Sequence, residues 1–511
     1  MRDANIGRWL SHHAALDADK TAIEFEGQQI SYAQLDRWSD AVASCLHHDH
    51  GVTYGDRVAV LALNHPATIA LLFACARLGA ILVPFNWRLA GEELSFMLAD
   101  AQAKLLLADA NFSDVGQAIA QSCKTEARAL EDLDALKMQA QCEPYIECGV
   151  MRDPVLIVYT SGTTGRPKGA LLDQDALFYN ALMSLDMHAM SSVDRVLVVL
   201  PLFHVGGLNI TLTPALYAGA TVLLQPRFDA QTTLQAIASF RPSLLVLVPA
   251  TISALLAASG WPDADLSCLR MVTTGSSIVP VPLIAAIEAR GVPVVQVYGS
   301  SETSPIAAYQ RPGEGRTHPH ATGRVGLHCQ IRLTRGDGTT IEDVGEHGEI
   351  EVRGPNVTRG YWRRPDDTEA SFRAGGWFRT GDIGCFDAEG HLYFQDRLKR
   401  MIISGGENIY SAEVERVLNE HPDVSESCVV GLPDERWGEV PAALVVCRGG
   451  VVFDEQAVRR HVAGKLARFK VPRHFAPVEQ LPRNAMGKVV VDDVRVLAVA
   501  KFLRNQLDDC G

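Results

Sequence analysis

Apolar and polar positions alternate in blocks from about residue 20 to residue 300, and the blocks predict strands followed by helices. Residues 58–63 and 81–85 are short apolar runs, and residues 68–78 between them have helical periodicity. Alternation of this kind is typical of layered α/β structure with a largely parallel sheet. We therefore expect a large N-terminal domain built of layered α/β subdomains.

The pattern changes beyond about residue 323, where short strands and frequent turns follow one another. Residues 330–333, 348–352 and 391–395 are such strands. They predict a small, twisted β unit that resembles a barrel.

A fresh α/β pattern begins after residue 397, with an apolar strand, a glycine turn and a helix that starts near Ser411. Serine is a favourable N-cap, because its hydroxyl can accept a hydrogen bond from a backbone N–H of the first turn. We expect two domains, residues 1–397 and residues 398–511, the second a small mobile α+β domain.

Composition limits the classes of partner. The 511 residues are 47% hydrophobic, which allows a large core and more than one domain. Sixty acidic residues against 47 basic residues give a net charge of -13, which disfavours nucleic acid and anionic membrane surfaces as partners. The sequence has neither an apolar run of about 20 residues nor a secretory pattern at its start, so a cytoplasmic location is expected. Whether the protein is a monomer or a homodimer is left open.

Eleven cysteines are scattered along the chain without a C-x-x-C pair. This spacing indicates neither a zinc site nor a disulfide framework.

The run at residues 159–169, YTSGTTGRPKG, is the most informative stretch of the chain. The apolar run at residues 154–158 precedes it, so the loop is expected to leave the end of a buried strand. Its glycines let the backbone turn N–H groups toward an anion, while its hydroxyls and lysine add donors and positive charge. The spacing G-x-x-G-x-x-K-G does not match the Walker pattern, so the ordinary P-loop NTPase is unsupported. The phosphate-binding candidates are Thr160, Ser161, Gly162, Thr163, Thr164, Gly165 and Lys168.

This run resembles the first core motif of the adenylate-forming superfamily, which includes acyl-CoA synthetases, adenylation domains of nonribosomal peptide synthetases and firefly luciferases. Further motifs of that superfamily follow in family order: YGSSET at 298–303, WFRTGD at 377–382, DRLK at 396–399 and LPRNAMGK at 481–488. The resemblance spans nearly the whole chain. It implies an AMP-forming acyl-CoA synthetase that uses ATP, Mg²⁺ and coenzyme A.

The resemblance also implies which residues hold the nucleotide. Tyr298, followed by Gly299, packs on the adenine, and Thr303 contacts the α-phosphate. Glu302 holds Mg²⁺, a hard cation that takes oxygen ligands. The family's turn beside the adenine and the acyl group is formed by Gly275, Ser276 and Ser277.

Four further roles follow from the later motifs. Asp382 accepts hydrogen bonds from the ribose hydroxyls, since a carboxylate is a suitable acceptor for a diol, and Arg397 lies near the same ribose. Lys399 stands at the hinge position. Lys488 is the catalytic lysine, which bridges the attacking carboxylate and the phosphate oxygens.

The segment PLFHVGG at 201–207 resembles the acyl-binding motif of acyl-CoA synthetases, with His204 among the catalytic residues. It has no acidic residue where amino-acid-activating relatives place an aspartate, so the pocket is expected to take an uncharged tail. Room for a bulky fatty, alicyclic or aromatic (cinnamate-like) acid is expected from Gly206, Gly207 and Gly275, with backbone packing as the alternative reason for these glycines. The coenzyme A tunnel is expected to be lined by Gly405, Gly406 and Trp437.

The motifs are compatible with more than one function. An adenylating enzyme that hands the acyl group to a separate carrier protein shares these motifs, and free coenzyme A as acceptor distinguishes the two. A catalytically silent nucleotide-binding regulator is disfavoured, because Lys488, Glu302 and Asp382 are all present. A nicotinamide dehydrogenase is disfavoured because no G-x-G-x-x-G joins an early strand to a helix.

Overall fold

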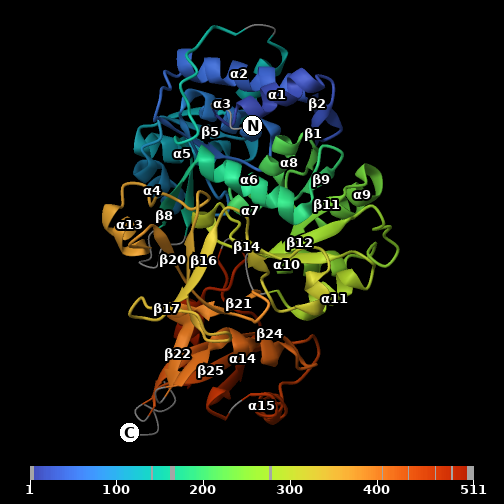
Figure 1. Ribbon diagram of the computed structural model, residues 1–511, viewed down its shortest axis with the longest axis vertical. Helices are drawn as coiled ribbons and strands as arrows, with labels where there is room; N and C mark the ends of the chain where they lie inside the picture. Colours follow the sequence, from blue (N-terminus) through green and yellow to red (C-terminus); the bar gives the residue numbers. More distant parts are fainter. Residues whose placement is uncertain are drawn as a thin grey trace. The chain divides into compact units, whose positions relative to one another are not determined.

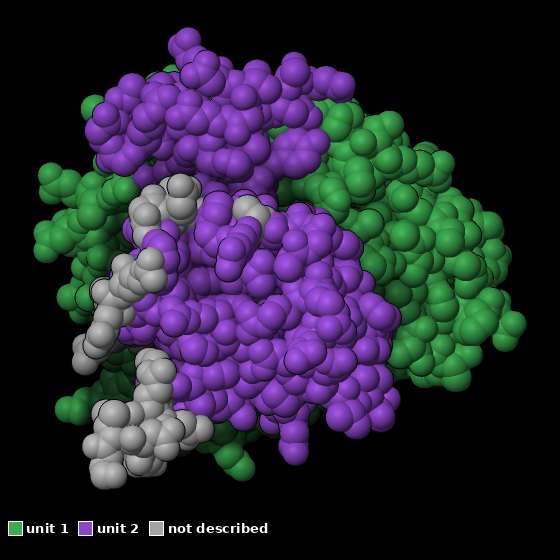
Figure 2. All heavy atoms as spheres, turned by 90° about the horizontal axis from the view of Figure 1, so that it is seen from below, with its two compact units in different colours: residues 1–332, 351–379, 390–392 green, residues 333–350, 380–389, 393–511 purple. Residues whose placement is uncertain are grey.

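The computed structural model describes residues 5–139, 142–160, 167–275, 279–404, 407–434, 437–466, 468–484 and 487–502. The chain forms two compact units, which Figure 2 colours separately. Unit 1 comprises residues 1–332, 351–379 and 390–392, and unit 2 comprises residues 333–350, 380–389 and 393–511. Among the described residues, no helix combines the length and the apolar composition that a membrane crossing needs.

The larger sheet of unit 1 is assembled from nine described strands. They are β1 (Thr21–Phe25), β2 (Gln28–Ser31), β9 (Arg195–Val198), β10 (Thr221–Leu224), β11 (Leu244–Leu247), β12 (Met271–Gly275), β13 (Val294–Tyr298), β14 (Ala308–Tyr309) and β15 (Arg324–Val325). Their order is β15-β14-β13-β12-β11-β9-β10-β1-β2, and Figure 1 labels β14, β12, β11, β9, β1 and β2 of this sheet. The strands from β1 across to β13 pair in parallel, and β2, β14 and β15 add antiparallel edges. The expected, largely parallel α/β architecture is confirmed.

The second sheet of unit 1 holds the glycine-rich run. Its strands are β3 (Arg57–Leu61), β4 (Ile81–Pro84), β5 (Leu105–Ala108), β6 (Glu126–Ala129), β7 (Pro154–Thr160) and β8 (Lys168–Asp173). They follow the order β6-β5-β3-β4-β7-β8 and are parallel except for the antiparallel pair of β7 and β8. The apolar runs at 58–63, 81–85 and 154–158 are therefore strands, as predicted.

Helices cover both sheets, and one of them lies deep in the core. Every residue of α3 (Pro66–Leu78) is buried, and its core cluster includes residues of both sheets, such as Val60 and Val222. A helix with apolar residues on nearly every face is expected in such a position, and its one charged residue, Arg77, is paired with Asp36 and Asp40. The other described α-helices of eight or more residues in unit 1 are α1 (Arg8–Leu16), α2 (Tyr32–His48), α4 (Gly91–Ala101), α5 (Ser113–Cys123), α6 (Gln174–His188), α9 (Ala230–Phe240), α10 (Pro249–Ala257) and α11 (Val281–Glu288), and unit 1 also contains the 3₁₀ helix Leu130–Met138.

Short strands follow residue 323, as the turn-rich pattern predicted. They are β16 (Gln330–Thr334), β17 (Thr340–Ile341), β18 (Gly348–Arg353), β19 (Phe372–Arg373), β20 (Trp377–Phe386) and β21 (Leu392–Arg397). These described strands form a six-stranded sheet in the order β17-β16-β18-β20-β19, with β21 paired to β20. The helix α13 (Pro365–Ser371) precedes β19.

The C-terminal part of unit 2 is a sheet with helices on both faces. Its described strands are β22 (Met401–Ser404), β23 (Glu407–Tyr410), β24 (Val424–Asp434), β25 (Gly438–Cys447) and β26 (His474–Pro477). Val429 packs against residues of α14 (Ser411–Asn419) and α15 (Glu455–Ala463), whereas its neighbour Val430 packs against α16 (Val491–Phe502). The two faces differ because successive side chains of a strand point to opposite sides.

The expected N-cap at Ser411 is wrong. Ser411 is the first residue of α14, and its hydroxyl donates to the carbonyl oxygen of Arg400 at 2.7 Å. The carboxylate of Asp396 takes the capping part instead, because its Oδ2 accepts from the backbone N of Ala412 at 2.9 Å. The start of α14 is thus tied to the DRLK motif.

Candidate active site

The glycine-rich loop joins the two strands of a hairpin. Thr160 pairs in register with Lys168, and its hydroxyl donates to the Lys168 carbonyl at 3.4 Å. The hairpin thus holds both ends of the loop side by side. The remaining predicted phosphate ligands, Ser161, Gly162, Thr163, Thr164 and Gly165, lie outside the described residues.

Lys168 is held at the base of this loop by two neighbours. Its Nζ forms an ion pair with Asp367 of α13, and the Lys168 side chain is only 15% exposed. The same Nζ lies 5.6 Å from the centroid of the Tyr361 ring, within the range of a cation–π contact. The ammonium therefore has a defined position before any phosphate is bound.

The turn after β13 needs a glycine at its start. Tyr298 is buried at the end of β13, and Gly299 follows with φ +157°. A Cβ at Gly299 would lie 1.8 Å from the carbonyl oxygen of Pro305, a distance that no side chain can occupy. Gly299 is therefore required by the close approach of the backbone.

Glu302 and Thr303 lie in the next turn, the 3₁₀ helix Ser301–Thr303. Glu302 Oε1 accepts from the hydroxyl of Tyr361 at 2.9 Å. The Thr303 hydroxyl accepts from the backbone N of Ser300 at 2.9 Å, so it takes part in closing the turn. The structure thus fixes both predicted side chains within unit 1.

The residues of this turn fit a bound Mg²⁺ ion. Besides the Glu302 carboxylate, the turn carries the hydroxyl of Ser300, which is buried and has no hydrogen-bond partner among the described residues. Magnesium prefers hard oxygen ligands and keeps several waters. A carboxylate and an unsatisfied hydroxyl in one turn suit those preferences, and Ser300 is a candidate that the motif assignments did not include.

Two glycines that were expected to leave room for the acyl group have a different explanation. A Cβ at Gly207 would lie 2.2 Å from the Pro201 carbonyl oxygen, and one at Gly275 would lie 2.4 Å from that of Val297. Backbone packing therefore accounts for both glycines. These two glycines therefore do not support the expectation of a bulky acid substrate. Ser276 and Ser277, which follow Gly275, lie outside the described residues.

His204 precedes the short helix Val205–Gly207 and caps it. Its Nδ1 accepts from the backbone N of Gly206 at 2.9 Å, so in the neutral ring the proton resides on Nε2. A π-helical stretch, Leu208–Leu212, follows directly. Such stretches are rare and often accompany functional sites.

Three predicted site residues come together in unit 2. Arg397 Nε lies 3.3 Å from Oδ1 of Asp382, whose side chain is almost fully buried. Two hydrogen bonds to Asn484 hold the backbone of Lys488. The Lys488 N donates to Oδ1 of Asn484 at 3.0 Å, and the Asn484 N donates to the Lys488 carbonyl oxygen at 2.9 Å. The charges of Asp382 and Arg397 both act on the Lys488 ammonium.

Lys488 retains exposed surface, yet its ammonium is perturbed. Desolvation, helped by the positive charge of Arg397 and to a smaller extent of Arg400, lowers the pKa of Lys488 to about 8. The negative charge of Asp382 opposes this shift in part. Lys488 can therefore change its charge close to neutral pH.

The residues assigned to the coenzyme A tunnel lie partly outside the described chain. Gly405 and Gly406 and the side chain of Lys399 are not described. Trp437 is 43% exposed, and its backbone N donates to Asp434 Oδ1 at 3.0 Å. Ser404 pairs with Gly438, so the strand that leads into the glycine pair ends beside the turn that carries Trp437.

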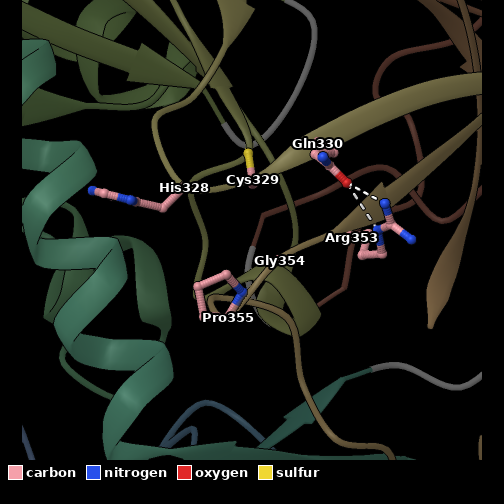
Figure 3. Close-up of a pocket in the computed structure, with 6 residues that line it drawn as sticks. All are labelled: His328, Cys329, Gln330, Arg353, Gly354 and Pro355. Carbon is pink, nitrogen blue, oxygen red and sulfur yellow. Dashed lines mark hydrogen bonds between the residues drawn. The ribbon is translucent and has the colours of Figure 1, made fainter. Parts of the chain in front are cut away.

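A hollow of about 430 Å³ lies elsewhere in unit 1 (Figure 3). Arg353 closes part of its wall by donating to Gln330 Oε1 at 2.8 and 2.5 Å. Its other lining residues are His328, Cys329, Gly354 and Pro355. None of these residues belongs to the motifs, so we assign no catalytic role to this hollow.

Comparisons with known proteins agree with the motifs. The family model described as AMP-binding enzyme matches residues 10–362, and the one described as AMP-binding enzyme C-terminal domain matches residues 413–488. Indoleacetate–CoA ligase of Aromatoleum aromaticum is 47% identical over 519 residues, which cover 98% of this chain and 99% of the relative. Feruloyl-CoA synthase of an Amycolatopsis species is 38% identical and covers 97% of this chain and 99% of its own.

Solved structures agree as well. The o-succinylbenzoate CoA synthetase MenE of Bacillus subtilis, in complex with its acyl-adenylate intermediate, aligns with a TM-score of 0.85 at 33% identity, covering 95% of this chain and 97% of that one. ATP-bound MatB of Rhodopseudomonas palustris aligns with a TM-score of 0.87 at 32% identity, covering 96% and 98%.

The chain belongs to the AMP-binding enzyme family, within the acyl-CoA synthetase branch of the adenylate-forming superfamily. It is an AMP-forming acyl-CoA synthetase, and ATP, Mg²⁺ and coenzyme A serve its reaction.

Proposed function

We propose that this synthetase activates a carboxylic acid that carries an aromatic ring, with the carboxylate on a short side chain of that ring. The names of three groups of relatives support this class, since indoleacetate, ferulate and 2-succinylbenzoate are all aromatic acids. The absence of an acidic residue at 203–208 agrees with an uncharged tail. The fatty and alicyclic acids expected from the sequence are the alternatives to be tested.

In the first half-reaction, a carboxylate oxygen of the acid attacks the α-phosphorus of ATP. The new bond gives the acyl-adenylate, and the bond from the α-phosphorus to the bridging oxygen breaks to release pyrophosphate. We assign to Lys488 the stabilisation of charge between carboxylate and phosphate, and to Asp382 and Arg397 the binding of the ribose. Bound Mg²⁺ supplies further neutralisation of phosphate charge, with Glu302 and Ser300 as its proposed ligands.

In the second half-reaction, the thiol of coenzyme A loses its proton and attacks the acyl carbon. The bond from that carbon to the AMP oxygen breaks, and acyl-CoA and AMP result. We assign to Gly405, Gly406 and Trp437 the contact with the pantetheine arm. A rotation of the C-terminal domain about Lys399 is part of the proposal, because one domain then serves both steps.

The observation that carries the assignment of the chemistry is the grouping of Asp382, Arg397 and Lys488 in one unit, with the pKa of Lys488 lowered to about 8. These residues come from three separate motifs, and Lys488 follows Arg397 by 91 positions. Their proximity agrees with a ribose and an α-phosphate held near one lysine.

The test is a product assay on purified protein with ATP, Mg²⁺ and coenzyme A. The acids are indole-3-acetate, ferulate, phenylacetate, benzoate and octanoate, and acyl-AMP and acyl-CoA are followed by mass spectrometry. We expect kcat/KM for at least one aryl acid to exceed that for octanoate by about tenfold or more, a ratio that a shaped apolar pocket can produce. Preference for octanoate would contradict the aryl assignment, and acyl-AMP without acyl-CoA would point to a carrier-protein acceptor.

A further inference from the structure

Three charged or polar side chains from separate segments of unit 1 form a chain of contacts. The hydroxyl of Tyr361 donates to Oε1 of Glu302 at 2.9 Å, and the face of its ring lies 5.6 Å from Nζ of Lys168. Glu302 is the proposed magnesium ligand, and Lys168 belongs to the phosphate loop. One aromatic side chain therefore contacts both a carboxylate and an ammonium that serve the triphosphate.

The backbone around Tyr361 is fixed against both partners. Leu171 N donates to the Gly360 carbonyl at 3.0 Å, and Trp362 N donates to the Gly169 carbonyl at 2.8 Å, so this segment lies along β8. Thr358 N donates to the carbonyl of Glu302 at 2.7 Å. The same short segment thus ties the phosphate-loop strand to the turn that holds Glu302.

Gly360 allows Tyr361 to reach this position. Its φ is +137°, and a Cβ there would lie 2.3 Å from Cγ2 of Thr368. The hydroxyl of Thr368 accepts from the backbone N of Tyr361 at 2.9 Å. The place of the Tyr361 ring is therefore set by backbone contacts on both sides.

We propose that Tyr361 is a positioning residue that orients the Glu302 carboxylate for its metal ion and holds the phosphate-loop ammonium at a fixed distance from it. A hydrogen bond to one carboxylate oxygen limits rotation of the group, and partners of this kind tune metal binding by first-sphere ligands. The ring face attracts the Lys168 ammonium by a cation–π interaction. The inference rests on the proposed role of Glu302.

The test measures binding of Mn²⁺, used as a paramagnetic substitute for Mg²⁺, by electron paramagnetic resonance in the presence of ATP and without any acid substrate. Tyr361→Phe removes the hydroxyl and keeps the ring over Lys168. We expect it to weaken Mn²⁺ binding by about tenfold or more, and to change ATP binding in EDTA by less than about twofold because the Lys168 contact is retained.

Tyr309→Phe is the matched control. The Tyr309 hydroxyl also donates to a carboxylate, at 2.6 Å to Asp186, in the same unit, and neither residue belongs to a motif. Its loss should leave Mn²⁺ affinity unchanged within about twofold, because Asp186 belongs to no proposed metal site. An equal loss of affinity in both variants would overturn the inference in favour of a general structural effect.

Glu302→Gln separates the inference from the function on which it rests. If Glu302→Gln does not weaken Mn²⁺ binding, the proposed role of Glu302 fails. If it does weaken binding while Tyr361→Phe has no effect, only the positioning role is overturned. The double variant Tyr361→Phe/Glu302→Gln should bind Mn²⁺ with the same affinity as Glu302→Gln alone, because Tyr361 acts through Glu302. Additive losses of affinity would contradict this coupling.

Discussion

Nε of Arg397 lies 3.3 Å from Oδ1 of Asp382, so a side chain that is 59% exposed pairs with a carboxylate that is 7% exposed. Both charges act on Lys488, the arginine lowering its pKa and the aspartate raising it. The ribose motif, the DRLK motif and the lysine motif therefore form one electrostatic group in unit 2.

Lys488→Ala should affect the two half-reactions differently. We expect adenylation to fall by about 10²-fold to 10³-fold, because a charge placed for the transition state is removed. The reaction of supplied acyl-adenylate with coenzyme A should change by less than about threefold, since it forms no bond at phosphorus. Single-turnover measurements of each step check this, and equal losses in both would refute the assigned role.

The adenylation rate should depend on pH through Lys488. With a pKa of about 8, the ammonium is charged below that value and neutral above it. We therefore expect kcat/KM for adenylation, which reports the free enzyme, to decline as the pH rises through about 8. In Lys488→Arg the guanidinium stays charged, so the alkaline decline should vanish even if the absolute rate is lower. An unchanged decline in that variant would assign the titration to another group.

His188 should make the protein less stable in mild acid. This fully buried ring shares hydrogen bonds with the Ser184 carbonyl at 2.9 Å and the Thr273 hydroxyl at 2.7 Å, and burial lowers its pKa to about 4. The unfolded chain binds a proton near the ordinary value of 6.5, so stability is complete above that pH and is lost as the pH falls toward 4.

When the pH is lowered from about 7.5 to about 5, the buried neutral His188 should reduce the free energy of unfolding by on the order of 2 kcal/mol. His188→Gln carries no such proton, so its apparent melting temperature should fall less than that of the wild type over this range. Parallel pH curves for the two proteins would show that His188 does not titrate on unfolding.

Lys399→Pro tests the proposed hinge. Lys399 lies in the 3₁₀ turn Leu398–Arg400, and proline would fix its φ and remove its N–H. We expect thioester formation to slow on the order of 10²-fold, because the thiol and the acyl carbon are then misaligned, while adenylation slows much less. Stopped-flow measurement of AMP release and of pyrophosphate release separates the steps, and an effect on neither would place the hinge elsewhere.

Local patterns predicted the elements well and the contacts between distant segments poorly. Apolar runs predicted β3, β4 and β7 because a buried parallel strand needs apolar residues on both faces. The cap of α14 was missed because its acceptor, Asp396, is separated from the helix by two strands, β22 and β23. Tyr361 was missed for the same reason, since 59 positions separate it from Glu302.

Glycines show the same limit at the candidate site. From the sequence, Gly207 and Gly275 could equally leave room for a substrate or allow close backbone packing. Only the distances from an added Cβ to the Pro201 and Val297 carbonyl oxygens show that packing requires them. A sequence records that a side chain is absent. It does not record which atom would have met that side chain.

The sequence by itself determined the fold class and the family, because hydrophobic periodicity and ordered motifs are properties of neighbouring residues. Only the tertiary structure decided which of those residues act on one another. Arg397 faces Asp382, Tyr361 joins Glu302 to Lys168, and Lys488 has a lowered pKa, because burial and charge depend on atoms brought together by folding.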